Sequence, residues 1–196
     1  MALYLGTIIF NTILIIILNY IFYSPINTQF SMFEFVIIVV LGVILEIIID
    51  IIFATVVRWI LPEKFFSIDK LYFSASKKEA RFYEKIGIKR WKDKALELGA
   101  VTGFRKNKLY NPQDNEYVKR FILEANYGIM VHVFCIVFGF LIMLANAFAP
   151  LFWVTLPIAI VNLFLNLLPI FILRYNLPKL HSLYKFNMRK SKISQI

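Results

Sequence analysis

The sequence has a single cysteine, Cys135, and only two histidines among its 196 residues. One cysteine excludes a disulfide framework, and so few sulfur and nitrogen ligands argue against a zinc site. Motifs of common soluble enzymes are also absent: there is no phosphate-binding glycine-rich loop, no Gly-x-Ser-x-Gly and no His-Glu-x-x-His. Neither histidine is followed four residues later by an aspartate, as the motif of common glycerolipid acyltransferases would require. We therefore expect neither a bound metal nor an organic cofactor.

Apolar residues are in excess, and they form long runs. Hydrophobic residues make up 60% of the chain and the mean hydropathy is +0.70, whereas a soluble domain is about half apolar. A helix crosses the hydrocarbon core of a bilayer with about 20 apolar residues. Four segments reach that length, namely 5–23, 35–60, 129–148 and 151–173. We predict an all-α integral membrane protein, in which one membrane domain contains four transmembrane helices arranged as two hairpins.

Lysine and arginine are missing from the two short links, 24–34 and 149–150, that join these segments in pairs. Of the 22 basic residues, Arg58 ends the second segment, fifteen lie in residues 61–127 and six lie in residues 174–196. Basic residues are retained on the cytoplasmic side of membrane proteins. We therefore predict a cytoplasmic segment 61–127, a basic cytoplasmic tail 174–196, and both termini in the cytoplasm. The first segment lacks the basic start and small-residue cleavage pattern of a signal peptide, so we interpret it as a retained helix.

The segment 61–127 interleaves aromatic with basic residues. Single-stranded nucleic acid is bound by such surfaces, but beside four membrane spans an interfacial segment on anionic lipid headgroups is the favoured interpretation, without nucleic acid. We expect short helices at 76–86 and 89–98 separated by Gly87, with Gly99 and Gly103 in the turn that follows. We also expect a polar helix at 116–126 that runs into the third span.

Ionisable and amide side chains inside a membrane helix are costly, and they usually face a protein interior or a water-filled cleft. Three spans carry one such side chain eight residues, or ~12 Å of helix, from a charged residue at the predicted cytoplasmic end. The pairs are Asp50 with Arg58, His132 with Glu124, and Asn166 with Arg174. If the helix faces converge, a carboxylate, an imidazole and an amide form one polar pocket open to the cytoplasmic leaflet.

This pocket has a competing interpretation, a mutually hydrogen-bonded network that only specifies helix packing. Glu46 lies four residues before Asp50 and so on the same helix face. Two neighbouring buried carboxylates repel each other unless they are paired or protonated. The presence of both carboxylates favours the functional interpretation.

Several motifs are similar to those of a known family. They are Pro62–Phe66, Phe82–Lys94, Phe104–Leu109, Glu124 with His132, and Asn166 with Arg174-Tyr175-Asn176 and Pro178-Lys179-Leu180. Over about residues 61–180 the chain resembles the glycosyl-4,4'-diaponeurosporenoate acyltransferases, small bacterial membrane proteins assigned to the last step of staphyloxanthin synthesis. The resemblance implies a bacterial cell-membrane acyltransferase of carotenoid biosynthesis. It would move a fatty acyl group, from acyl-CoA or acyl carrier protein, to a hydroxyl of a glycosylated lipid or glycosyl carotenoid.

For that reaction we expect His132 to act as the general base, oriented by Glu124 or Asp50. Asn166 would stabilise a developing oxyanion. The phosphate of a carrier-linked donor would be bound by Arg174 and the neighbouring surface residues. The expected substrate-binding residues are Glu46, Arg58, Trp91, Lys92, Arg174, Tyr175 and Asn176.

The sequence is also compatible with two other functions. One is a different lipid-modifying enzyme on the same scaffold, and the other is a lipid-binding or accessory membrane protein without activity. An ion pathway is disfavoured because Asn146 and Thr155 are nearly the only polar side chains in the outer half of the spans.

Overall fold

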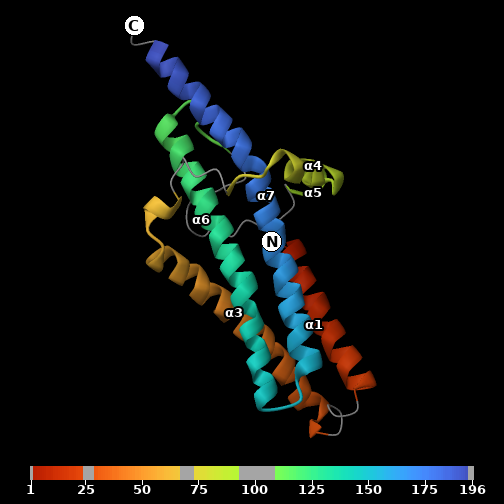
Figure 1. The fold of residues 1–196 in the computed structure, drawn as a ribbon. Coiled ribbons are helices and arrows are strands. Elements are labelled where there is room, and N and C mark those ends of the chain that lie inside the picture. Colours follow the sequence, from red (N-terminus) through yellow and green to blue (C-terminus); the bar gives the residue numbers. More distant parts are fainter. Residues whose placement is uncertain (1, 24–28, 67–72, 93–108, 194–196) are drawn as a thin grey trace. The chain divides into compact units, whose positions relative to one another are not determined.

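The computed structural model describes residues 2–23, 29–66, 73–92 and 109–193, and these contain helices and no strand (Figure 1). Four helical stretches in this part of the chain are long and apolar enough to cross a membrane. They are α1 (Ala2–Phe22), α3 (Met32–Ile60), α6 (Asn115–Gly139) with its 3-10 continuation η5 (Phe140–Ala147), and α7 (Phe152–Ile193). The predicted all-α class with four spans is confirmed.

The third and fourth membrane-spanning helices, α6 and α7, extend well beyond the apolar runs predicted from the sequence. Helix α6 begins at Asn115 and includes the expected polar helix without a break. Helix α7 has 42 residues and continues to Ile193, so residues 174–193 are helical. Shorter elements lie between α3 and α6: η1 (Glu63–Phe66), α4 (Lys77–Lys85) and α5 (Ile88–Trp91). The rest of the helix expected at 89–98, the expected turn at Gly99 and Gly103, and residues 104–108 of one family-like motif lie outside the described residues.

The chain folds as two compact units. The first unit comprises Met1–Val56 and His132–Leu167. Its buried core includes Ile15 of α1, Phe35 and Val39 of α3, and Ile158 of α7. Gly42 of α3 lies against Ile158, because a Cβ at Gly42 would be 3.1 Å from the Ile158 Cδ1 atom. Many large apolar side chains on α1 and α3 are exposed, as expected for helices that face lipid.

The second unit comprises Val57–Val131 and Leu168–Ile196. Helix α4 begins with a capping box, in which the Ser76 hydroxyl accepts from the Glu79 N–H and the Glu79 carboxylate accepts from the Ser76 N–H. Gly87 has φ +71°, which allows the left-handed turn between α4 and α5. Tyr83 and Ile88 then pack against Tyr175 of α7 in a buried cluster.

Two prolines inside α7 release carbonyl groups for other segments. A proline has no N–H, so the carbonyl four residues earlier loses its helical partner. Pro157 releases the Trp153 carbonyl of the first unit, and this oxygen accepts a hydrogen bond of 2.9 Å from Asn19 Nδ2 of α1. Pro178 releases the Arg174 carbonyl of the second unit, which accepts a bond of 3.1 Å from the Ala75 N–H. These prolines therefore attach α1 and the start of α4 to α7.

Candidate functional site

Helices α3 and α7 of the first unit bring a carboxylate and two amides into contact. Asn162 Nδ2 donates to Asp50 Oδ1 at 3.2 Å, and Asn166 Nδ2 donates to Asp50 Oδ2 at 3.1 Å. The two asparagines are joined by a bond of 2.7 Å from Asn166 Nδ2 to Asn162 Oδ1. Asn162 Nδ2 also reaches the Cys135 carbonyl of α6 at 3.3 Å. Each oxygen of the Asp50 carboxylate thus accepts an amide hydrogen from α7.

His132 of α6 joins this cluster through Asn166. Its Nδ1 atom lies 2.8 Å from Asn166 Oδ1. Because Asn166 Nδ2 is directed at oxygens of Asp50 and Asn162, its Oδ1 must accept, and His132 Nδ1 carries the donated hydrogen. A neutral imidazole held in this tautomer has Nε2 in its proton-accepting form. The structure therefore brings together Asp50, Asn166 and His132, in the order carboxylate, amide and imidazole.

Glu46 is buried beside the same cluster, with 5% of its surface exposed. Neither of its carboxylate oxygens has a hydrogen-bond partner among the described residues. A Cβ at Gly139 of α6 would lie 2.5 Å from Glu46 Oε1 and 2.4 Å from Asn162 Nδ2. Only glycine leaves room for both side chains at this point.

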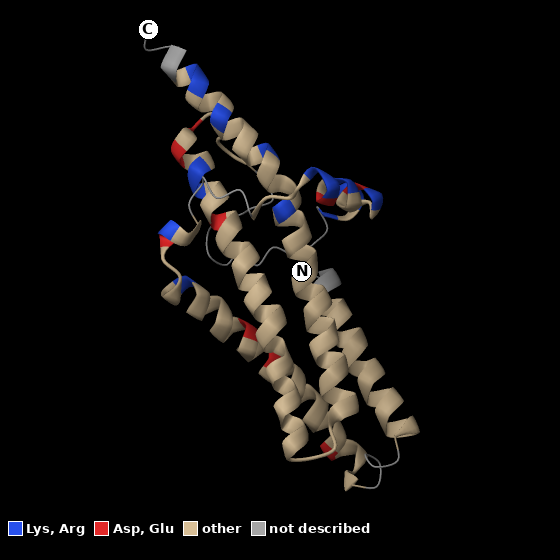
Figure 2. Ribbon diagram, viewed as in Figure 1, with Lys and Arg blue, Asp and Glu red and all other residues tan. Residues whose placement is uncertain are grey.

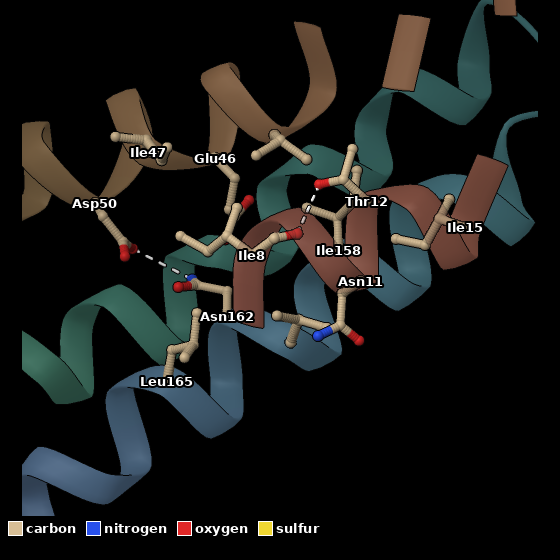
Figure 3. A pocket seen from close by; sticks show the side chains of 12 residues that line it. Ile8, Asn11, Thr12, Ile15, Glu46, Ile47, Asp50, Ile158, Asn162 and Leu165 are labelled. Carbon is tan, nitrogen blue, oxygen red and sulfur yellow. Dashed lines mark hydrogen bonds between the residues drawn. The ribbon is translucent and has the colours of Figure 1, made fainter. Parts of the chain in front are cut away.

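A pocket of about 50 Å³ opens beside Glu46 and Asp50 (Figure 3). Helix α1 contributes Asn11 and Thr12 to its wall, α3 contributes the two carboxylates and α7 contributes Asn162. The remaining seven lining residues are aliphatic: Ile8, Ile15, Val43, Ile47, Ile158, Val161 and Leu165. His132 and Asn166 are not among the lining residues. Among the described residues, no group of three or more His, Cys, Asp and Glu side chains could hold a metal ion.

In the second unit, Arg174 is bound to the Glu79 carboxylate by two charged hydrogen bonds, of 2.5 Å from Nε and 2.7 Å from Nη2. Its Nη2 also donates to the Ser74 carbonyl at 3.3 Å. The Tyr83 hydroxyl donates to the same carboxylate. These bonds, with that from Arg174 as the largest cause, lower the pKa of Glu79 to about 2. Burial and the neighbouring Glu79 carboxylate raise the pKa of Tyr83.

The predicted interfacial residues Arg58 and Glu124 form an ion pair of 2.7 Å in the second unit. The Arg58 guanidinium also lies 5.3 Å from the centre of the Tyr127 ring. The eight-residue spacing from Asn166 also predicted Arg174 at the cytoplasmic end of its span. In the structure Arg174 is bound to Glu79 of α4. The substrate-binding and orienting roles predicted for these three residues stay predictions.

Four further residues with a predicted substrate-binding role lie in or beside helices of the second unit, namely Trp91, Lys92, Tyr175 and Asn176. Trp91 Nε1 donates to the Ile86 carbonyl at 3.1 Å, and Lys92 is half-buried at the end of α5. The Tyr175 hydroxyl donates to Glu84 at 3.1 Å. Glu84 also pairs with Lys89, and the hydrogen bonds from Lys89 and Tyr175 lower the pKa of this carboxyl group. Asn176 is half-buried. The substrate-binding roles predicted for these four residues also stay predictions.

Sequence reasoning did not assign roles to Asn162, Gly139, Glu79 or Tyr83. The position of Asn162 in the sequence could have indicated its place in the cluster, because it precedes Asn166 by four residues and so shares its helix face. Glu79 had the capping-box spacing from Ser76, which places it in the first turn of α4. Nothing in the sequence indicates that Arg174, 95 positions later, is the partner of Glu79.

Comparison with protein families supplies the identity of this scaffold. The sequence model of the family described as glycosyl-4,4'-diaponeurosporenoate acyltransferase matches residues 62–185. This range contains His132, Asn166 and Arg174, whereas α1, Glu46 and Asp50 lie before it. Searches of curated proteins and of solved structures gave no match. The four apolar helices are those of a membrane protein, and the family model matches more than half of the sequence. This multi-pass membrane protein belongs to the glycosyl-4,4'-diaponeurosporenoate acyltransferase family.

Proposed function

We propose that this protein transfers a fatty acyl group to a hydroxyl of a glycosylated lipid or glycosyl carotenoid, at a site open to the cytoplasmic leaflet. The family supplies the reaction class. The observation that carries the assignment to residues is the hydrogen-bonded series from Asp50 through Asn166 to His132. A packing network would be satisfied by any polar pairing, whereas this series holds an imidazole in one tautomer.

His132 is the catalytic base in this proposal. Its Nε2 accepts the proton of the acceptor hydroxyl while the hydroxyl oxygen attacks the carbonyl carbon of an acyl thioester. The new C–O bond forms, the C–S bond of acyl-CoA or acyl carrier protein breaks, and the leaving thiolate takes the proton from His132. The products are the ester and the free thiol.

Asn166 and Asp50 act as positioning residues. Asn166 Nδ2 is engaged by oxygens of Asp50 and Asn162, so its N–H groups are occupied within the protein. This geometry favours a role in holding His132 over the oxyanion-stabilising role expected from the sequence. Asp50 in turn holds Asn166, since both of its oxygens accept amide hydrogens from α7.

The donor and the anionic headgroups are proposed to meet the basic surface of α4 and α5. Exposed Lys77, Lys78, Arg81 and Lys85 line α4, and Figure 2 shows this concentration of basic residues. Phe82 on the same helix is 51% exposed. An aromatic ring beside ammonium and guanidinium groups suits the boundary between acyl chains and phosphates. Because Arg174 is paired with Glu79, these exposed side chains and Lys92 are the better candidates for phosphate contacts.

The test uses the purified protein in lipid vesicles, with radiolabelled acyl-CoA or acyl carrier protein and a glycosylated lipid as acceptor. His132→Ala is expected to lower the rate of acyl transfer by about a hundredfold or more. Asn166→Leu is expected to lower kcat by tens of fold with little change in KM, because it misplaces the base and leaves the acceptor contacts intact.

The second histidine of the chain provides the matched control. His181 is a buried residue of the second unit and has no role in the proposed reaction, so His181→Gln should retain wild-type transfer. Folding of each variant is checked by its helical circular dichroism. A folded His132→Ala protein with wild-type activity would refute the assignment.

A further inference from the structure

The polar groups that line the pocket beside Glu46 are mainly hydrogen-bond acceptors. Asn11 Nδ2 donates to the Thr7 carbonyl and Thr12 Oγ1 donates to the Ile8 carbonyl, both at 2.8 Å. The bond of Thr12 uses its only donor hydrogen and leaves its Oγ1 lone pair as an acceptor. The bond of Asn11 uses one of its two Nδ2 hydrogens, so Asn11 keeps the second hydrogen and its Oδ1 acceptor. Glu46 adds two carboxylate oxygens that accept no hydrogen bond from any described residue. The lining contains no lysine, arginine or histidine.

A wall rich in acceptors and without a cationic side chain favours one kind of ligand. Phosphate, sulfate and carboxylate groups are themselves acceptors and would face Glu46 and Asp50 without a compensating cation. Hydroxyl groups donate to carboxylate and amide oxygens, and their carbon atoms suit the aliphatic side chains that make up the rest of the wall. At about 50 Å³, with roughly 10–15 Å³ needed per water, the pocket accommodates a hydroxyl-bearing group of a few atoms.

We propose that this pocket binds a hydroxyl-bearing group of the glycosylated acceptor, with Glu46 and Thr12 as its hydrogen-bond acceptors. The proposal rests on the proposed acyl transfer and names the residues that select its acceptor. Asn11, Thr12 and Glu46 all precede residues 62–185, the range that the family model matches. Helix α1 and the middle of α3 are therefore the part of this chain that selects the acceptor, while the base lies in the matched range.

Binding is measured with the full-length protein in lipid nanodiscs, using radiolabelled dodecyl glucoside as the probe. Dodecanol and dodecyltrimethylammonium serve as competitors with the same chain length. Unlabelled glucoside should compete better than either. Glu46→Leu removes both carboxyl oxygens and Thr12→Val removes the hydroxyl oxygen. Each should weaken glucoside binding by about five- to tenfold, the effect of losing one hydrogen bond to the ligand.

Two matched controls are available in the same unit. Thr55 makes the same kind of bond as Thr12, from its hydroxyl to the Ile51 carbonyl at 2.9 Å, but it is exposed and outside the pocket. Glu34 is an exposed carboxylate at the start of α3. Thr55→Val and Glu34→Leu should bind the glucoside as the wild type does.

The outcomes separate this inference from the proposed function. Unchanged glucoside binding by both pocket variants would overturn the inference, as would stronger competition by the ammonium amphiphile or equal competition by dodecanol. Binding that depends on Glu46 and Thr12, in a protein that shows no acyl transfer, would support the pocket and refute the proposed reaction. In an active protein, the pocket variants should raise the KM for the acceptor and leave kcat within about twofold.

Discussion

At the scale of single residues, buried amides and one glycine hold the polar cluster of the first unit. Asn162 and Asn166 are 6% and 5% exposed, and their amide groups are bonded to side chains and carbonyls of α3, α6 and α7. A buried polar group that loses its partner costs about 1–3 kcal/mol. The cluster is therefore sensitive to any change that moves Asn162 away from Asp50.

Gly139→Ala makes such a change without removing a polar group. The added Cβ would stand 2.4 Å from Asn162 Nδ2 and 2.5 Å from Glu46 Oε1, so these side chains must move. We expect a loss of stability of about 1–3 kcal/mol and a loss of acyl transfer. Thermal unfolding in detergent micelles measures the first effect.

Gly6→Ala is the control for that prediction. Gly6 lies in α1, and no described heavy atom other than its chain neighbours and the nearby backbone of its own helix lies within 4 Å of the position a Cβ would take. Alanine is the better helix former by up to about 1 kcal/mol, so this variant should be as stable as the wild type or more stable. Equal stability of the two alanine variants would contradict the packing described for Gly139.

At the scale of elements, Arg174 fastens α4 to α7 in the second unit. Its guanidinium holds Glu79, and its carbonyl, released by Pro178, accepts the Ala75 N–H. The family-like run Arg174-Tyr175-Asn176-x-Pro178 therefore has a structural basis, in which one residue contributes both its side chain and its backbone. Tyr83 and Ile88 complete the attachment by packing on Tyr175.

Glu79→Gln should loosen this attachment. Trp91 packs against the Tyr83, Ile88 and Tyr175 cluster, so its fluorescence reports on it once Trp59 and Trp153 are replaced by phenylalanine. We expect a red-shifted Trp91 emission in Glu79→Gln, because a neutral amide cannot replace the paired carboxylate. Lys89→Gln removes an exposed ion pair and should change the emission little. Identical spectra for wild type and Glu79→Gln would count against the attachment.

The ion pair between Arg174 and Glu79 predicts that the attachment of α4 to α7 depends on pH. The folded pKa of Glu79, about 2, lies below its ordinary value of 4.5. The ion pair therefore contributes fully above pH ~4.5, and its contribution is lost as the pH falls from there towards 2. In the wild type, the Trp91 emission should begin its red shift below pH ~4.5 and complete it near pH 2. In Glu79→Gln this acid transition should be absent, and an identical transition in both proteins would assign it to another group.

At the scale of the whole molecule, the distribution of lysine and arginine predicts the orientation in the membrane. Cys135 is the single cysteine of the sequence, so a Cys135→Ala background has no thiol. Cysteines introduced one at a time can then report on which side of the membrane they lie. Lys85→Cys and Lys190→Cys should react with a membrane-impermeant maleimide only from the cytoplasmic side. Gln29→Cys and Phe148→Cys should react only from outside, because they lie between paired spans without basic residues. Labelling of Lys85→Cys and Phe148→Cys from the same side would refute the predicted topology.

The sequence by itself determined the class, the four spans and the spacing of their polar side chains. Hydropathy and charge act locally along the chain, and a helical repeat of 3.6 residues converts spacing into depth and face. On this basis Asp50, His132 and Asn166 were expected at one level. The sequence also contained the motifs of the family, since these are runs of neighbouring residues.

Only the tertiary structure decided which of those side chains are in contact. The rotation of each helix about its axis depends on packing with its neighbours, and no local pattern encodes it. That is why the amide of Asn166 was not foreseen as the group that contacts His132, nor Glu79 as the partner of Arg174. It is also why the pocket, whose wall joins α1 to residues more than a hundred positions away, is a property of the fold and not of any one segment.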